Sequence, residues 1–185
     1  RHLVRSLDPP APPEAAEVAA GLVYRDFITV GLLVDRLEVE QEGGGLIQDN
    51  WIYIQEPDVL VGRMQVFNNW SPGMVADRSK AWIGLEYFCN AGDEVWRLDD
   101  EAMIALAVSE MERIGIVDPL KVRDGVVIRV PKAYPTYLGS YDRLPRLRAF
   151  LDGIPNLWVL GRNGMHRYNN QDHSMLTAMF AVQNM

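Results

Sequence analysis

The sequence predicts an α+β fold built on a mostly antiparallel sheet, with helices inserted between its strands. Strand-like apolar segments follow one another through short turns, which favours antiparallel pairing because a parallel return needs a long crossover. Helix-like segments, with apolar residues at helical spacing, come mainly in the second half of the chain. The composition, 48% hydrophobic and 23% charged among 185 residues, is that of a globular protein with a sizeable core.

The first ninety residues supply most of the expected strands. Residues 1–7 read as the end of a helix or a connector, which Asp8–Pro13 stops because proline removes a backbone donor. A short helix is expected over Glu14–Ala20, with Gly21 at its end. A buried β-branched strand is expected from Tyr24 to Val34, continuing toward Val39. Three further strands, separated by turns, are expected over residues 51–55, 63–67 and 81–89.

The second half alternates helices with single strands. Asp99 or Asp100 is expected to cap the clearest helix, which runs to Ile114 and is closed by Gly115. Its apolar stripe is expected to face the core; the members of the stripe are Met103, Ile104, Ala107, Met111 and Ile114. The later elements are expected as a strand over 126–130, a helix over 144–151, a short strand over 156–160 and a helix over 172–183.

Charge and composition exclude several classes of protein. The net charge is −7, and no cluster of lysines and arginines offers a surface for nucleic acid or anionic membrane. The longest near-apolar run, Phe27–Val34, is far too short to cross a bilayer. The single cysteine, Cys89, cannot form an internal disulfide, which fits a cytoplasmic location. The chain begins with Arg1 inside helix-like sequence, so it is expected to be a piece of a longer protein.

Nucleotide and metal motifs are missing from the sequence. It contains no G-x-G-x-x-G, no G-x-x-x-x-G-K-[ST] and no paired C-x-x-C, so a complete nucleotide-binding half is not expected. The histidines His2, His166 and His173 match no common spacing of metal ligands, and no metal site is expected.

The segment from Asn156 to Met179 reads as strand, glycine-rich polar loop and helix. Gly161 and Gly164 let the backbone approach a ligand closely, and two arginines in the loop could hold an anion. The following helix begins with free N–H groups, which suits a phosphate or a ring that becomes anionic on reduction. The residues alone also permit a surface ion pair for Arg162 and a plain helix cap at Asp172.

The same segment resembles the C-terminal flavin signature of the UDP-galactopyranose mutase family, G-R-x-G-x-Y-R-Y-x-D-x-D. The sequence departs from it at His166, where the family has tyrosine, and at Asn170, where it has aspartate, two departures expected on the substrate side. Residues 129–137 resemble the R-x-P-x-A-x-P-x-Y segment of oxidases in the same superfamily, which includes amine oxidases and protoporphyrinogen oxidases. The ungapped matches to the flavin signature are Gly161, Arg162, Gly164, Arg167, Tyr168 and Asp172.

The resemblance implies an FAD-dependent oxidoreductase, in which residues 1–155 are a substrate-binding α+β domain. Residues 156–185 would then be the returning strand, loop and helix that contact the flavin, and the N-terminal dinucleotide-binding domain would lie outside this chain and be its partner. The chain alone is expected to be inactive. The residues implied to bind FAD are Gly161, Arg162, Gly164, Gln171, Asp172 and Ser174. Those implied on the substrate side are Arg167, Tyr168 and Asn170, and the catalytic candidates are Lys132, Tyr168 and Asp172.

Two alternatives remain open at this point. A mutase of the UDP-galactopyranose type would use reduced flavin as a nucleophile at a sugar carbon, so the substrate is either a small molecule or a sugar nucleotide. A non-catalytic α+β module for binding or dimerisation is the alternative from another class. If the loop contacts a flavin held elsewhere, Gly161–Asp172 should be accessible to solvent in this chain.

Overall fold

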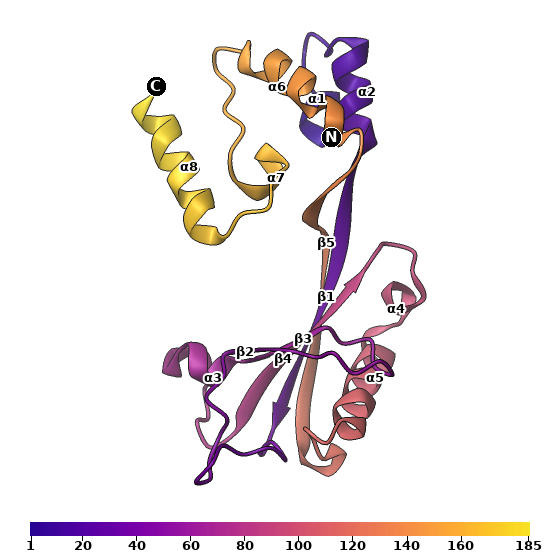
Figure 1. Cartoon of the computed structure of the whole chain (residues 1–185), viewed down its shortest axis with the longest axis vertical. Helices are drawn as coiled ribbons and strands as arrows, with labels where there is room; N and C mark the ends of the chain where they lie inside the picture. Colours follow the sequence, from indigo (N-terminus) through magenta and orange to yellow (C-terminus); the bar gives the residue numbers. More distant parts are fainter. The chain divides into compact units, whose positions relative to one another are not determined.

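A computed structural model describes residues 1–185, and they form two compact units. Unit 1 consists of Arg1–Arg25 and Lys132–Met185, and unit 2 of Asp26–Pro131. The boundary falls inside two long strands, β1 (Leu22–Val34) and β5 (Val122–Gly139), as the colours of Figure 1 allow the reader to follow. The expected division after residue 155 does not coincide with this boundary, and the roles given to 1–155 and 156–185 stay predictions.

One open sheet carries the fold, and the predicted α+β class is confirmed. Its order is β2-β3-β4-β1-β5, and β1–β4, β2–β3 and β3–β4 pair antiparallel. The prediction for β4 holds at both ends, and β1 begins two residues before the predicted start. Its continuation toward Val39 is wrong, because β1 ends at Val34. The remaining strands are β2 (Trp51–Tyr53), β3 (Arg63–Val66) and β4 (Ala81–Cys89).

The core of unit 2 lies on one face of this sheet. Alternate side chains of β1 and β4 point to that face, where Val30 pairs with Leu85 and Leu32 with Ile83. Helix α5 (Asp100–Arg113) packs there through three fully buried residues, and each buried methionine side chain contributes about 1.5–3 kcal/mol by leaving water. These residues are Met103, Ala107 and Met111, as the predicted stripe required.

The start of α5 is also as predicted. The Asp99 side chain accepts a hydrogen bond of 2.8 Å from the Ala102 N–H, so Asp99 is the N-cap. The short elements of unit 2, which the sequence analysis did not predict, are α3 (Phe67–Trp70), η1 (Pro72–Met74), α4 (Glu94–Arg97) and η2 (Pro119–Lys121).

Unit 1 is mainly helical and has a smaller apolar core. Its two central helices pack through Val18 and Ala19 on one side and Leu147 and Leu151 on the other. No helix in the chain has the length and apolar character needed to span a membrane. The helices of unit 1 are α1 (His2–Arg5), α2 (Pro13–Gly21), η3 (Tyr141–Arg143), α6 (Leu144–Asp152), α7 (Gly161–Met165) and α8 (Gln171–Gln183).

Two predictions in the C-terminal part of unit 1 are wrong. Residues 156–160 are not a strand, because no neighbouring strand pairs with them. Leu160 is nevertheless extended, with φ −123° and ψ 158°. The glycine-rich stretch that follows forms the short helix α7 and not an irregular loop. Although the segment has no paired strand, its side chains still alternate between core and solvent. Leu157 and Val159 pack on the core of unit 1, whereas Trp158 is partly exposed.

Candidate functional site

The candidate site is built around the junction of α7 and α8. Gly161 has a φ of +65°, in the left-handed region that favours glycine. Its N–H donates to the Thr177 hydroxyl over 3.1 Å, and that hydroxyl donates to the Ser174 carbonyl over 2.8 Å. A Cβ at position 161 would lie 3.2 Å from the Ser174 hydroxyl oxygen. A glycine is therefore required here by both the backbone angle and the close approach of α8.

Arg162 ties the segment after α7 to β5. Its Nε donates to the Asn169 carbonyl over 2.8 Å, and a terminal nitrogen lies 3.4 Å from the Ala133 carbonyl. The guanidinium also lies over the rings of Tyr134 and Tyr168, 5.0 and 4.7 Å from their centroids. No carboxylate pairs with Arg162, so the surface ion pair is excluded. Three of its five N–H groups remain for a ligand.

His166 is buried, with 1% of its surface exposed, which corrects the expectation that it lies on the substrate side. Its φ of +48° turns the side chain inward at the end of α7. The ring meets Tyr24 edge-on at 4.8 Å, and Nε2 lies 2.9 Å from the Thr136 carbonyl. Nδ1 has no hydrogen-bond partner. Burial lowers the pKa of His166, since the charged form would lose its hydration.

The three predicted substrate-side residues come together. Arg167, Tyr168 and Asn170 line a hollow of about 360 Å³ beside the start of α8. Tyr168 is half exposed, and its N–H donates to the Tyr137 hydroxyl over 3.1 Å. Apart from the buried His166, the stretch from Gly161 to Asp172 is exposed or half-buried, as expected for a segment that contacts a ligand held elsewhere. The other lining residues of the hollow are Met165, Asn169, His173 and Thr177.

The start of α8 is open, but Asp172 is not its cap. Asn170 is the N-cap residue and makes no side-chain capping bond, while Asp172 lies within the first turn. The Asp172 carboxylate contacts His173 Nδ1 at 3.0 Å, and the His173 N–H lowers the pKa of that carboxyl. Because the N-cap residue makes no side-chain bond, the N–H groups of the first turn that the Asp172 carboxylate does not engage are available to an acceptor. Ser174 instead donates its hydroxyl to Asn169 over 2.8 Å, which fixes the loop against the helix.

The Lys132 side chain does not line the hollow at the start of α8. Its Nζ lies 2.7 Å from His2 Nε2. Its backbone takes the left-handed φ of +56°, and its carbonyl accepts from the Asn163 side chain over 3.3 Å. The structure brings the other catalytic candidates, Tyr168 and Asp172, to the α7–α8 junction.

Two supporting residues were missed by the sequence analysis. Tyr134 stacks on Tyr168, with ring centroids 5.9 Å apart and planes 19° apart, and it belongs to the matched segment 129–137. Thr177 lies one helical turn after Ser174, so its side chain shares a face of α8 with that serine. The spacing was visible in the sequence, but nothing there indicated the bond to Gly161.

Comparison with known proteins gives a likeness at the level of structure. No protein-family model matches the sequence, and no curated protein matches it. One similar solved structure is reduced UDP-galactopyranose mutase, with a TM-score of 0.69, 21% identity, and coverage of 90% of this chain and 34% of the other. Another, provisionally named protoporphyrinogen oxidase from Exiguobacterium sp. 255-15, has a TM-score of 0.69, 15% identity, and coverage of 99% and 38%.

These two likenesses define the fold of the chain. It has the fold of one part of a mutase and of one part of an oxidase, and it spans 34% and 38% of their lengths. At such identities the likeness extends to the fold alone. The function must therefore be argued from the residues at the α7–α8 junction.

Proposed function

We propose that this chain is the substrate-side and flavin-contacting part of an FAD-dependent oxidoreductase of the amine-oxidase superfamily. The observation that carries the proposal is the exposed junction between α7 and α8. There Arg162 fixes the segment whose residues match the flavin signature. Beside it lie the hollow lined by Arg167, Tyr168 and Asn170 and a helix start whose N-cap residue makes no side-chain bond. The fold likeness to a mutase and an oxidase supports the same superfamily.

The residues present suit a dinucleotide with a flavin ring. Gly161 and Gly164 permit the tight packing of the turn that carries Arg162, whose remaining N–H groups can donate to a diphosphate or ribityl oxygen. A Cβ at position 164 would lie 3.3 Å from the Val159 carbonyl carbon, so a larger residue would disturb the turn. FAD, when bound, accepts electrons from the substrate. The first-turn N–H groups of α8 would stabilise negative charge on the ring.

The exposed surface of α8 supports a missing partner domain. Only one residue of this thirteen-residue helix, Ala181, is buried, although the helix is rich in apolar side chains. Such a helix is stable when another layer covers it. We propose that a dinucleotide-binding domain provides that layer. A cytoplasmic location belongs to the same proposal, since a chain with a single cysteine cannot form an internal disulfide. The exposed apolar side chains of α8 are Met175, Leu176, Met179, Phe180 and Val182.

The test uses the protein expressed from its natural reading frame and reconstituted with FAD. Charge-assisted hydrogen bonds are worth roughly 1.5–3 kcal/mol each, so Arg162→Ala should weaken FAD retention about ten- to a hundredfold. Arg5→Ala, which removes an exposed arginine in α1, is the matched control and should retain FAD fully. Asp172→Ala should keep its flavin and turn over slowly. Full retention and a full rate in Arg162→Ala would exclude the assignment.

A mutase-like activity is the second candidate. The observation in its favour is that His166 is buried and does not line the hollow, so Asn170 is the one departure from the mutase signature that lies on the substrate side. Arg167 lines the hollow and suits the diphosphate of a sugar nucleotide. The reduced and the oxidised protein should each be incubated with UDP-galactopyranose. Isomerisation by the reduced protein alone identifies a mutase, and substrate-driven reduction of the flavin by another compound identifies an oxidoreductase.

A further inference from the structure

A second hollow lies in unit 2, beyond the end of β1, and nothing proposed so far uses it. Its volume is about 250 Å³, and its walls come from residues 35–46, 68 and 78–81. The floor is apolar, since Leu37 and Ala81 are buried and Val39 and Leu46 pack against the same core. A site of this size suits a ligand smaller than a typical cofactor.

The rim of this hollow carries more positive than negative charge. Arg36 and Arg78 both line it, both are exposed, and neither forms an ion pair within the chain. Lys80 is the third cation, and Asp35 and Glu40 are the two carboxylates. The chain as a whole has a net charge of −7, so a cationic rim departs from the rest of the surface. Unpaired arginines at an apolar hollow suit an organic anion.

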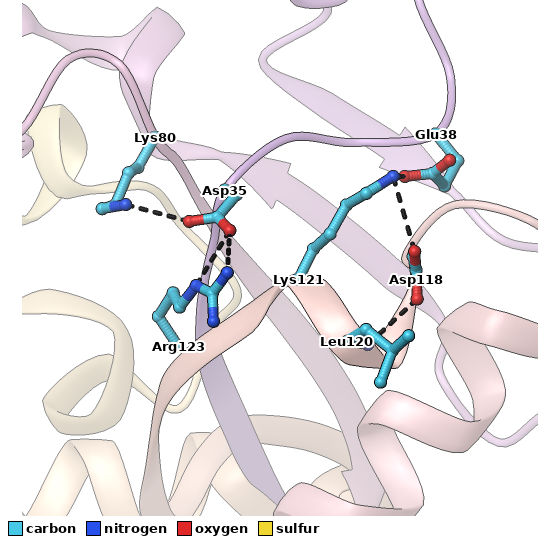
Figure 2. A network of polar contacts seen from close by, with 7 residues as sticks. All are labelled: Asp35, Glu38, Lys80, Asp118, Leu120, Lys121 and Arg123. Atoms are coloured by element: carbon cyan, nitrogen blue, oxygen red, sulfur yellow. Dashed lines mark hydrogen bonds and ion pairs between the residues drawn. The ribbon is translucent and has the colours of Figure 1, made fainter.

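One of the two carboxylates, Asp35, is already paired with two cations, as Figure 2 shows. Asp35 accepts from Lys80 over 2.9 Å and from Arg123 through Nε over 2.8 Å and a second, shorter contact. Arg123 first, and then Lys80, lower the pKa of the Asp35 carboxyl, which stays ionised and paired. Asp35 therefore offers little repulsion to an incoming anion. Glu40, which has no such partner, is the one charge on the rim that opposes it.

The wall beside Lys80 is fixed by hydrogen bonds. The Asn68 side chain donates to the Lys80 carbonyl over 2.8 Å and accepts from the Trp82 N–H over 2.9 Å. The strand start at Ala81 is thus held to α3, and the cations on this side project from an ordered backbone. A preformed wall lowers the ordering cost of binding.

We propose that this hollow binds a small carboxylate that carries a short apolar chain. The guanidinium groups of Arg36 and Arg78 hold the carboxylate, since their planar forks match its two oxygens. The apolar chain lies on the floor formed by Leu37, Val39, Leu46 and Ala81. Inorganic phosphate would have only the first of these contacts. The site belongs to unit 2 alone and does not depend on the flavoenzyme assignment.

The experiment is calorimetric titration of the full chain at constant ionic strength with acetate, butyrate, hexanoate and inorganic phosphate. Affinity should rise from acetate to hexanoate, by about fourfold for each buried CH₂ at 0.8 kcal/mol. Arg78→Ala and Arg36→Ala should each weaken hexanoate binding about tenfold or more. Glu40→Gln should strengthen it several-fold, because it removes the opposing charge, and a residue with a purely structural role would not act in that direction.

Arg5→Ala, which removes an exposed arginine of unit 1, is the control for net charge. This variant should bind hexanoate as the unaltered chain does. The absence of saturable binding would overturn the proposal. So would an equal loss in Arg5→Ala, which would indicate a general charge effect. Equal affinity for phosphate and all three carboxylates would overturn the role of the apolar floor. Thermal unfolding of every variant checks that the hollow is still formed.

Discussion

Glu110 offers a quantitative test of the core of unit 2. This carboxylate lies on α5 and is only 4% exposed. It accepts from the N–H groups of Leu60 and Val61 over 2.6 and 3.2 Å, and from the Tyr87 hydroxyl over 2.9 Å. The segment before β3, strand β4 and helix α5 thus meet at one side chain. Burial, and then Glu110, raise the pKa of Tyr87, so its hydroxyl remains a donor.

The expected cost follows from these three bonds. Glu110→Ala removes the acceptor of three donors, two of them in the backbone, and each donor left unsatisfied costs about 1–3 kcal/mol. Water entering the vacated space recovers part of this, so the total loss should be about 3–5 kcal/mol. Tyr87→Phe removes one donor and leaves the others paired, at about 1–2 kcal/mol. Glu110→Gln keeps one acceptor oxygen and should fall between the two.

The assay is urea unfolding of the full chain, followed by tryptophan fluorescence, with the free energy of unfolding extrapolated to water. Glu112→Ala, an exposed glutamate near the end of the same helix, is the control and should change stability by less than about 0.5 kcal/mol. A loss below about 1 kcal/mol in Glu110→Ala would refute the reasoning, because the buried donors would then need no carboxylate.

Three further outcomes are expected. Asp35→Asn should lower the melting temperature near neutral pH, and the difference from the unaltered chain should vanish in acid. The reason is that the pKa of Asp35 is lowered from its ordinary value of 3.8, so the ionised carboxylate stabilises the fold above pH 3.8, and this stabilisation is lost as the pH falls below that value. Because the pKa of His166 is lowered, the unfolded state binds more protons than the folded state below pH 6.5, and the chain should become less stable as the pH falls. His166→Gln should flatten the dependence of the melting temperature on pH in that range. The purified chain should be colourless, because it lacks the dinucleotide-binding motif. A full equivalent of bound flavin in visible spectra would contradict the expectation that this chain alone does not hold FAD.

Elements with two agreeing local signals were predictable from the sequence. Strand β4 combines an apolar run with turns on both sides, and α5 combines the Asp99 cap with an apolar stripe. The boundary between the units was not predictable, because it falls within two continuous strands at Arg25 and Pro131, where no glycine- or serine-rich linker marks it. The strand expected over 156–160 failed because pairing depends on a neighbour that this chain does not supply.

The candidate site was predictable only in part. The match to the flavin signature located the α7–α8 junction and the residues that line its hollow, Arg167, Tyr168 and Asn170. It could not indicate that His166 turns inward, since a left-handed backbone at a histidine has no sequence pattern of its own. The role of Tyr134 depends on tertiary packing of β5 against the loop, which periodicity does not encode.

The two units differ in how the chain builds them. Unit 2 is one uninterrupted segment, Asp26–Pro131, whereas unit 1 is assembled from both ends of the chain. Unit 2 is therefore an insertion, entered along β1 and left along β5, which are neighbours in the sheet. For evolution by recombination this is an advantage: a different inserted segment could be exchanged between the two strands while every residue at the α7–α8 junction stays unchanged. The inserted segment and the residues at the α7–α8 junction can then diverge independently.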